Sequence, residues 1–198
     1  MPHHMTAADI FAYWKALREG NLPPLRSCIA PSNIRGALPD LFMLDVNDGD
    51  VPVFRLAGTR ICALFAQELR GLPFAHLWAQ GQADNAVALS HAAIQYACPF
   101  LLNVTGFTTE GVAQRFDVLL LPLRSSTGNC DRLMGALVAQ GHGINLSAEA
   151  TLSGLYIDRS RPLADIGDAI RVASTTTRPV SAAKTDTKET GKPVIFAR

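Results

Sequence analysis

The residues of this sequence that could act as nucleophile, base or phosphate ligand do not form a recognisable catalytic group. Ser90 and His91 are adjacent, and neighbouring side chains on a helix diverge by about 100°, so the two cannot form a nucleophile–base dyad. Gly141-His142-Gly143 begins like a phosphate-binding GxGxxG loop, but Leu146 takes the place of the last glycine. We therefore expect no catalytic residues, and an enzyme is the least supported function.

Two further sets of residues have the composition of a metal site without its spacing. The cluster Asn47-Asp48-Gly49-Asp50 is acidic, yet counting a calcium loop from Asp45 places glycine at position 5 instead of 6 and Leu56 where glutamate is needed. The four cysteines are at least 32 residues apart and form no CxxC pair. We expect no metal site, reduced cysteines, and a hairpin turn at residues 47–50.

Length and composition predict one cytoplasmic domain with a hydrophobic core. Of the 198 residues, 48% are hydrophobic and 18% charged, which are ordinary values for a globular protein. The 18 basic and 17 acidic residues nearly cancel, which argues against nucleic-acid binding. No apolar run approaches the roughly 20 residues of a membrane helix, and the N-terminus does not resemble a secretion signal. We therefore expect neither a nucleic acid nor a membrane as partner.

The chain divides into three parts. Residues 1–24 hold a helix followed by the break Pro23-Pro24, and residues 25–160 hold the main domain. Residues 173–198 contain five basic and two acidic residues and eight Ser or Thr. Such a segment has too little apolar surface to offset its ordering entropy, so we predict a disordered basic tail.

The leading helix is amphipathic and should dock on something. Thr6 and Asp9 have the spacing of a capping box and predict a helix over about residues 7–20. Its apolar residues fall on one stripe: Ile10, Phe11, Trp14 and Leu17. This stripe must pack either on its own domain or on a second copy in a homodimer, and the sequence leaves both alternatives open.

The remaining elements predict an α+β fold. Two hairpin-linked sets of strands flank a helical stretch, which gives a five-stranded antiparallel sheet with helices on one face, preceded by the N-terminal amphipathic helix. The segment 152–157 can be read as a strand or as a helix. The expected strands are 41–46, 53–57, 99–107, 112–121 and 132–139, with short helical pieces over 59–78 and a longer helix over 82–97.

Two arginines on these strands lack an obvious partner. Arg55 and Arg132 lie among apolar neighbours. Each either faces solvent or pairs with a carboxylate such as Glu68, and the first alternative is favoured.

This order of elements resembles that of a PAS domain. Specific strings agree with it, including Phe54–Ile61 (FRLAGTRI) after the first hairpin and Arg132–Gly135 (RLMG) in the last strand. Leu38-Pro39, Glu68-x-x-Gly71 and Leu121-Pro122-Leu123 also match. The chain is most similar to a single-domain bacterial PAS subfamily formerly catalogued as a domain of unknown function. It departs from that subfamily at Ala66-Gln67, where a glycine is usual.

The resemblance implies a sensory or regulatory PAS module of signal transduction. Only about 58 residues follow residue 140, so the module is expected to signal in trans through a protein partner, as a homodimer, with an unidentified small molecule as ligand. The second hypothesis is an adaptor that docks proteins without a ligand. The third is an uncharacterised enzyme.

The resemblance also indicates where a ligand would bind, between the sheet and residues 59–97. The cofactor is unknown. Haem bound through His91 is one candidate, because haem-binding relatives use a histidine on the longer helix. Flavin-binding relatives carry a reactive cysteine on the short helix after the first two strands. The corresponding stretch here, Leu69–Trp78, contains no cysteine, so a flavin adduct is not expected. The hypothetical pocket residues are Phe54, Leu56, Phe65, Phe74, Trp78, His91, Phe100, Phe116 and Val118.

Overall fold

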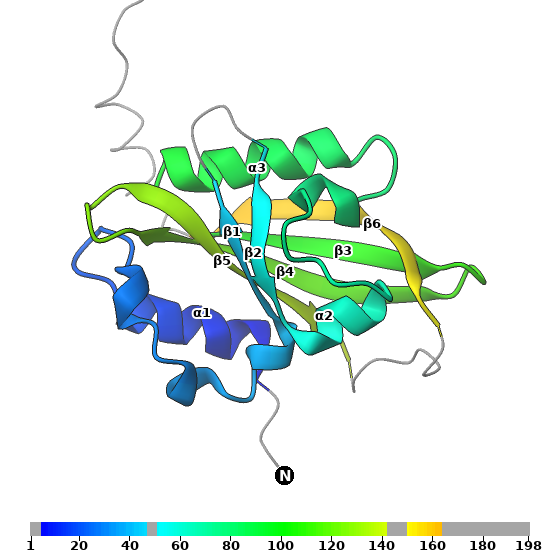
Figure 1. Cartoon of the computed structure of the whole chain (residues 1–198), viewed down its shortest axis with the longest axis horizontal. Helices are drawn as coiled ribbons and strands as arrows, with labels where there is room; N and C mark the ends of the chain where they lie inside the picture. The colour runs from blue at the N-terminus through cyan, green and yellow to red at the C-terminus, as the bar shows by residue number, and fades with distance from the viewer. Residues whose placement is uncertain (1–4, 47–50, 142–149, 164–198) are drawn as a thin grey trace, which may run out of the picture.

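The strands form a single antiparallel sheet in a computed structural model that describes residues 5–46, 51–141 and 150–163. The strand order is β2-β1-β5-β4-β3-β6 (Figure 1). The expected α+β fold is confirmed, and the ambiguous segment near residue 152 is a sixth strand at the edge beside β3. The strands are β1 (Leu41–Asp45), β2 (Val53–Ala57), β3 (Phe100–Thr108), β4 (Ala113–Arg124), β5 (Cys130–Ala139) and β6 (Leu152–Pro162).

One face of the sheet, here called the inner face, is covered by the segment between β2 and β3. This segment contains α2 (Thr59–Leu64), the 3₁₀ turn η4 (Phe74–Leu77) and α3 (Ala83–Gln95). The helix expected over 82–97 is thus present, and α3 lies along this face of the sheet (Figure 1). The predicted turn at 47–50 and the predicted tail at 173–198 lie outside the described residues.

The opposite, outer face is covered by the N-terminal segment, so helices lie on both faces of the sheet. Helix α1 (Ala7–Ala16) begins at the predicted capping box of Thr6 and Asp9. It contacts β4 and β5. Three 3₁₀ turns follow it before β1: η1 (Arg26–Cys28), η2 (Pro31–Ile34) and η3 (Leu38–Asp40).

The apolar stripe of α1 packs on the chain's own domain, where Ile10 and Trp14 are fully buried. The indole N–H of Trp14 donates to the carbonyl oxygen of Pro122 at 2.9 Å. Of the two alternatives for the helix, packing on its own domain therefore holds for Ile10 and Trp14, and these two residues offer no surface to a second copy. Phe11 and Leu17 remain partly exposed.

Because both faces are covered, the sheet separates two apolar cores. Alternate residues of β4 supply them, with Phe116 and Val118 in the inner core and Leu119 and Leu121 in the outer core. Burial on both faces explains why β4 and β5 read as nearly continuous apolar runs instead of alternating ones.

Candidate functional site

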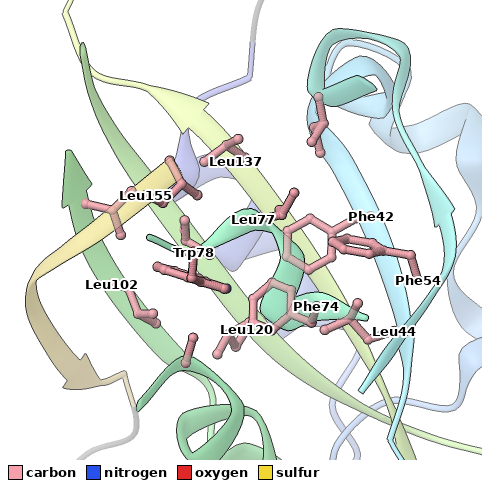
Figure 2. Close-up of a cluster of buried hydrophobic side chains, with 14 of the residues drawn as sticks. Phe42, Leu44, Phe54, Phe74, Leu77, Trp78, Leu102, Leu120, Leu137 and Leu155 are labelled. Atoms are coloured by element: carbon pink, nitrogen blue, oxygen red, sulfur yellow. The ribbon is translucent and has the colours of Figure 1, made fainter. Parts of the chain in front are cut away.

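Four aromatic rings form the centre of the inner core. They come from three elements, with Phe42 on β1, Phe54 on β2, and Phe74 and Trp78 on and just after η4 (Figure 2). Neighbouring ring centroids lie 5.4–5.8 Å apart in tilted or edge-to-face arrangements, the geometry that aromatic quadrupoles favour. These contacts fill the space between β1, β2 and η4.

The position of Phe42 depends on a glycine in the neighbouring strand. Phe42 on β1 lies opposite Gly135 on β5. A Cβ atom at residue 135 would overlap the Phe42 ring, so the ring lies against the backbone of β5 because no side chain is there. Gly135, the last residue of the RLMG string, therefore sets how closely the aromatic rings approach the sheet.

Trp78 holds a buried polar group without a partner. Its side chain is 7% exposed, and its Nε1 donor has no acceptor within the described part of the chain. Leaving a buried donor unsatisfied costs about 1–3 kcal/mol. A hydrogen-bond acceptor brought into this core would remove that cost.

Strand β6 fixes the backbone around Trp78. Trp78 and Leu155 form an isolated parallel bridge, and the N–H of Ala79 donates to the carbonyl oxygen of Leu155 at 3.0 Å. Figure 2 shows the Trp78 ring among Leu155, Leu102 and Phe74, which come from β6, β3 and η4. An element that the sequence left undecided therefore positions the indole.

Most of the predicted pocket residues do come together in the inner core. The structure places five of them in its buried cluster: Phe54, Phe74, Trp78, Phe116 and Val118. Phe65 and Phe100 are partly buried and pack against that cluster.

Leu56 is not in this cluster, contrary to the prediction. Simple alternation along β2 would place Leu56 on the same face as Phe54. Met43 pairs with Leu56 while Leu44 pairs with Phe54, so Arg55 is the extra residue of a β-bulge. The bulge moves Leu56 to the outer face, where it is 43% exposed.

His91 does not point into the inner core either. The buried residues of α3 are Ala86, Ser90 and Ala93, and the Ser90 hydroxyl is bonded to the carbonyl oxygen of Ala86. His91 follows Ser90, so its side chain points about 100° away, and it is partly exposed. His91 is therefore not placed to bind the iron of a haem group in the inner core.

The thiols and carboxylates form no metal centre within the described residues. None of the four cysteines, all of which lie in the described ranges, forms a disulfide, and Cys28 is exposed. The Cys62 sulfur, on α2, lies 3.9 Å from a carboxylate oxygen of Glu68. Burial raises the pKa of the Cys130 thiol from 9.0 to about 11. The nearby Asp131 carboxylate also raises this pKa, whereas Arg124 lowers it.

Arg55 and Arg132 share a partner, Asp45. The Asp45 carboxylate lies 3.5 Å from Arg55 and 3.1 Å from Arg132. The alternative of ion pairing is therefore the one found, with Asp45 in place of Glu68. These pairs join β2, β1 and β5 across the outer face near one end of the sheet.

A family comparison agrees with this architecture. The PAS domain family model matches residues 2–138, and the chain belongs to the PAS domain family. PAS domains are sensory modules, and this chain has the fold of one. No described helix is long and apolar enough to span a membrane.

Comparison with solved structures finds light-oxygen-voltage (LOV) domains. A LOV domain studied with a flavin analogue is 12% identical, with 56% of this chain and 84% of that chain covered and a TM-score of 0.45. The dark-state LOV domain of the blue-light photoreceptor Aureochrome1 is 15% identical, with 56% and 82% covered and a TM-score of 0.44. The Rhodobacter sphaeroides LOV protein is 14% identical, with 56% and 66% covered and a TM-score of 0.43. The comparison with curated proteins gave no match.

Proposed function

We propose that this chain is a sensory or regulatory PAS module that binds a small molecule in its inner core. It passes the signal to a partner protein in trans and carries no catalytic activity of its own. The lack of any disulfide among the four described cysteines supports a reducing, cytoplasmic location.

The observation that carries the proposal is the indole N–H of Trp78, which finds no acceptor in the part of the chain that the structure describes. It is the one indole donor of the inner core, because the second tryptophan, Trp14, lies on the outer face. An apolar ligand with one hydrogen-bond acceptor, such as a carbonyl or ring nitrogen, would contact the aromatic rings and accept from Nε1.

The segment that covers this core consists of short elements, so it can change conformation when such a ligand binds. Between α2 and α3 it holds only the four-residue turn η4, and Phe74 and Trp78 lie on or directly after that turn. Short, broken elements rearrange at lower cost than a long helix. A ligand that displaces Trp78 would also act on β6 through the Trp78–Leu155 bridge, which gives the signal a route to the sheet edge.

A second candidate is the ligand-free adaptor, and two observations favour it. The rings of Phe42, Phe54 and Phe74 are essentially fully buried and in mutual contact, so much of the inner core is already filled. An exposed aromatic pair, Phe107 and Tyr156 with ring centroids 5.4 Å apart, lies on β3 and β6. Exposed aromatic side chains are typical of protein contacts, including contacts in a homodimer.

Native mass spectrometry of freshly purified protein separates the two candidates. We expect a bound mass that is lost on denaturation, and a lower occupancy in Val118→Phe because the larger ring occupies ligand space. If the core is already full, the same substitution should lower the free energy of unfolding by about 1–3 kcal/mol through overpacking. That loss, together with no bound mass in the unsubstituted protein, would overturn the sensor proposal in favour of the adaptor.

A further inference from the structure

A second site lies on the outer face, away from the inner core. A cavity of about 380 Å³, partly open to solvent, lies between the segment before β1 and the outer surface of β1, β2 and β5. Its floor includes Met43, Leu56 and Met134, and its roof includes Arg26 and Ile34. The volume falls within the range of about 300–1,000 Å³ that is usual for small-molecule sites.

The first part of the roof of this outer cavity, residues 25–29, is flanked by hydrogen-bonded anchors. Arg124 donates from its backbone N–H to Pro24 and from Nε to Pro23, at 2.9 and 2.7 Å. Further along, the N–H of Ala30 donates to the hydroxyl of Tyr13 at 2.9 Å. The stretch between these two anchors is thus tied to the end of β4 on one side and to α1 on the other, so its hydrogen bonds fix its position over the cavity.

The floor of the cavity is apolar and incompletely covered. Met43 and Met134 are cross-strand partners on β1 and β5, and the β-bulge brings Leu56 beside them. Leu56 is 43% exposed and Leu38, which also lines the cavity, is 40% exposed. Burying these side chains under an apolar ligand would be favourable by the hydrophobic effect.

The charge at the cavity specifies the ligand further. Among the described residues, Arg26 is the one charged residue in the lining, which contains no carboxylate. Arg26 makes no ion pair within the described ranges, whereas the nearest arginines along β2 and β5, Arg55 and Arg132, are paired with Asp45. The guanidinium of Arg26 is therefore available to an anion.

We propose that the outer cavity binds an amphiphilic monoanion, a carboxylate carried on a single apolar chain. The chain lies on Met43, Met134 and Leu56, and the carboxylate accepts hydrogen bonds from Arg26. This site goes beyond the proposed sensory function and does not depend on it, because the sheet separates the residues of the outer cavity from those of the inner core.

Methionine methyl groups give a direct readout with the full chain. Decanoate is titrated into protein carrying ¹³C-labelled methionine methyl groups, and the resonances are assigned with Met43→Leu and Met134→Leu. We expect the Met43 and Met134 signals to shift while that of Met5, which does not line the cavity, stays in place. Decanol, which has the same chain without the charge, should give the same pattern at higher concentration.

Two substitutions of exposed arginines test the charged contact. Arg26→Gln should weaken decanoate binding about tenfold, the usual effect of losing one charge-assisted hydrogen bond, and leave decanol binding unchanged. Arg35→Gln, in the same segment but outside the lining, should leave both unchanged.

Three results would overturn the proposal. The first is the absence of methyl shifts at millimolar decanoate, and the second is equal decanoate binding by the Arg26→Gln and Arg35→Gln proteins. The third is a shift of the same methyl signals on raising the protein concentration alone, which would assign the cavity to a second copy of the chain. Trp78→Phe should not change these shifts, so failure here and failure of the inner-core proposal remain distinguishable.

Discussion

The indole N–H of Trp14 donates to the carbonyl oxygen of Pro122 at 2.9 Å, in the buried layer between α1 and β4. This bond joins residues 108 positions apart and attaches the N-terminal helix to the sheet. The other tryptophan, Trp78, lies on the opposite face with its N–H unpartnered among the described residues. The two tryptophans therefore provide a matched pair for the same substitution.

Trp14→Phe should destabilise the protein more than Trp78→Phe. The first change leaves the buried Pro122 carbonyl without its donor and should lower the free energy of unfolding by about 1–3 kcal/mol. The second removes a donor that has no acceptor among the described residues, so the only loss expected is that of the smaller ring volume, offset by the relief of the unsatisfied donor. Urea denaturation measures both, and equal losses would show that the Trp78 donor is satisfied in solution.

Gly135→Ala should displace the ring of Phe42. The added methyl group occupies space now taken by that ring, and overpacking of this kind costs about 1–3 kcal/mol. A smaller side chain at residue 42 should relieve the clash, so Gly135→Ala combined with Phe42→Leu should be less destabilised than the sum of the single variants. Strict additivity in this double-mutant cycle would contradict the close approach of residues 42 and 135.

Cys130 should resist alkylation at neutral pH. Because burial and Asp131 raise its pKa to about 11, little reactive thiolate is present, and iodoacetamide should modify the exposed Cys28 first. Peptide mass spectrometry of the native protein gives both rates. Modification of Cys130 as fast as Cys28 would contradict the burial of its thiol.

The same pKa shift gives the sign of a pH effect on stability. The folded state holds the Cys130 proton more tightly than the unfolded state, so the contribution of this group is constant below pH 9.0 and is lost as the pH rises toward about 11. A Cys130→Ser variant should show a smaller decline of stability over that range. An identical decline would assign the loss to other groups.

The features that sequence alone could predict were those with local causes. The capping box of Thr6 and Asp9 begins α1, and the two-residue period of a strand places Phe116 and Val118 of β4 on the same face. The bulge at Arg55 has no local signal, since it is visible only in the pairing with β1, so Leu56 was placed on the wrong face. The sequence does not distinguish a strand from a helix in β6, because the register shifts of this strand interrupt the alternation that marks a strand.

The two indole N–H resonances test the central claim most directly. Spectra of ¹⁵N-labelled protein purified under native conditions are compared with those of the same protein after denaturation, dialysis and refolding, which removes any bound molecule. If a ligand occupies the inner core, the Trp78 signal should move between the two preparations, while the Trp14 signal, held by Pro122 on the other face, stays in place. Identical Trp78 signals in the two preparations, with no bound mass in the native protein, would contradict the claim that this PAS module holds a small molecule at Trp78.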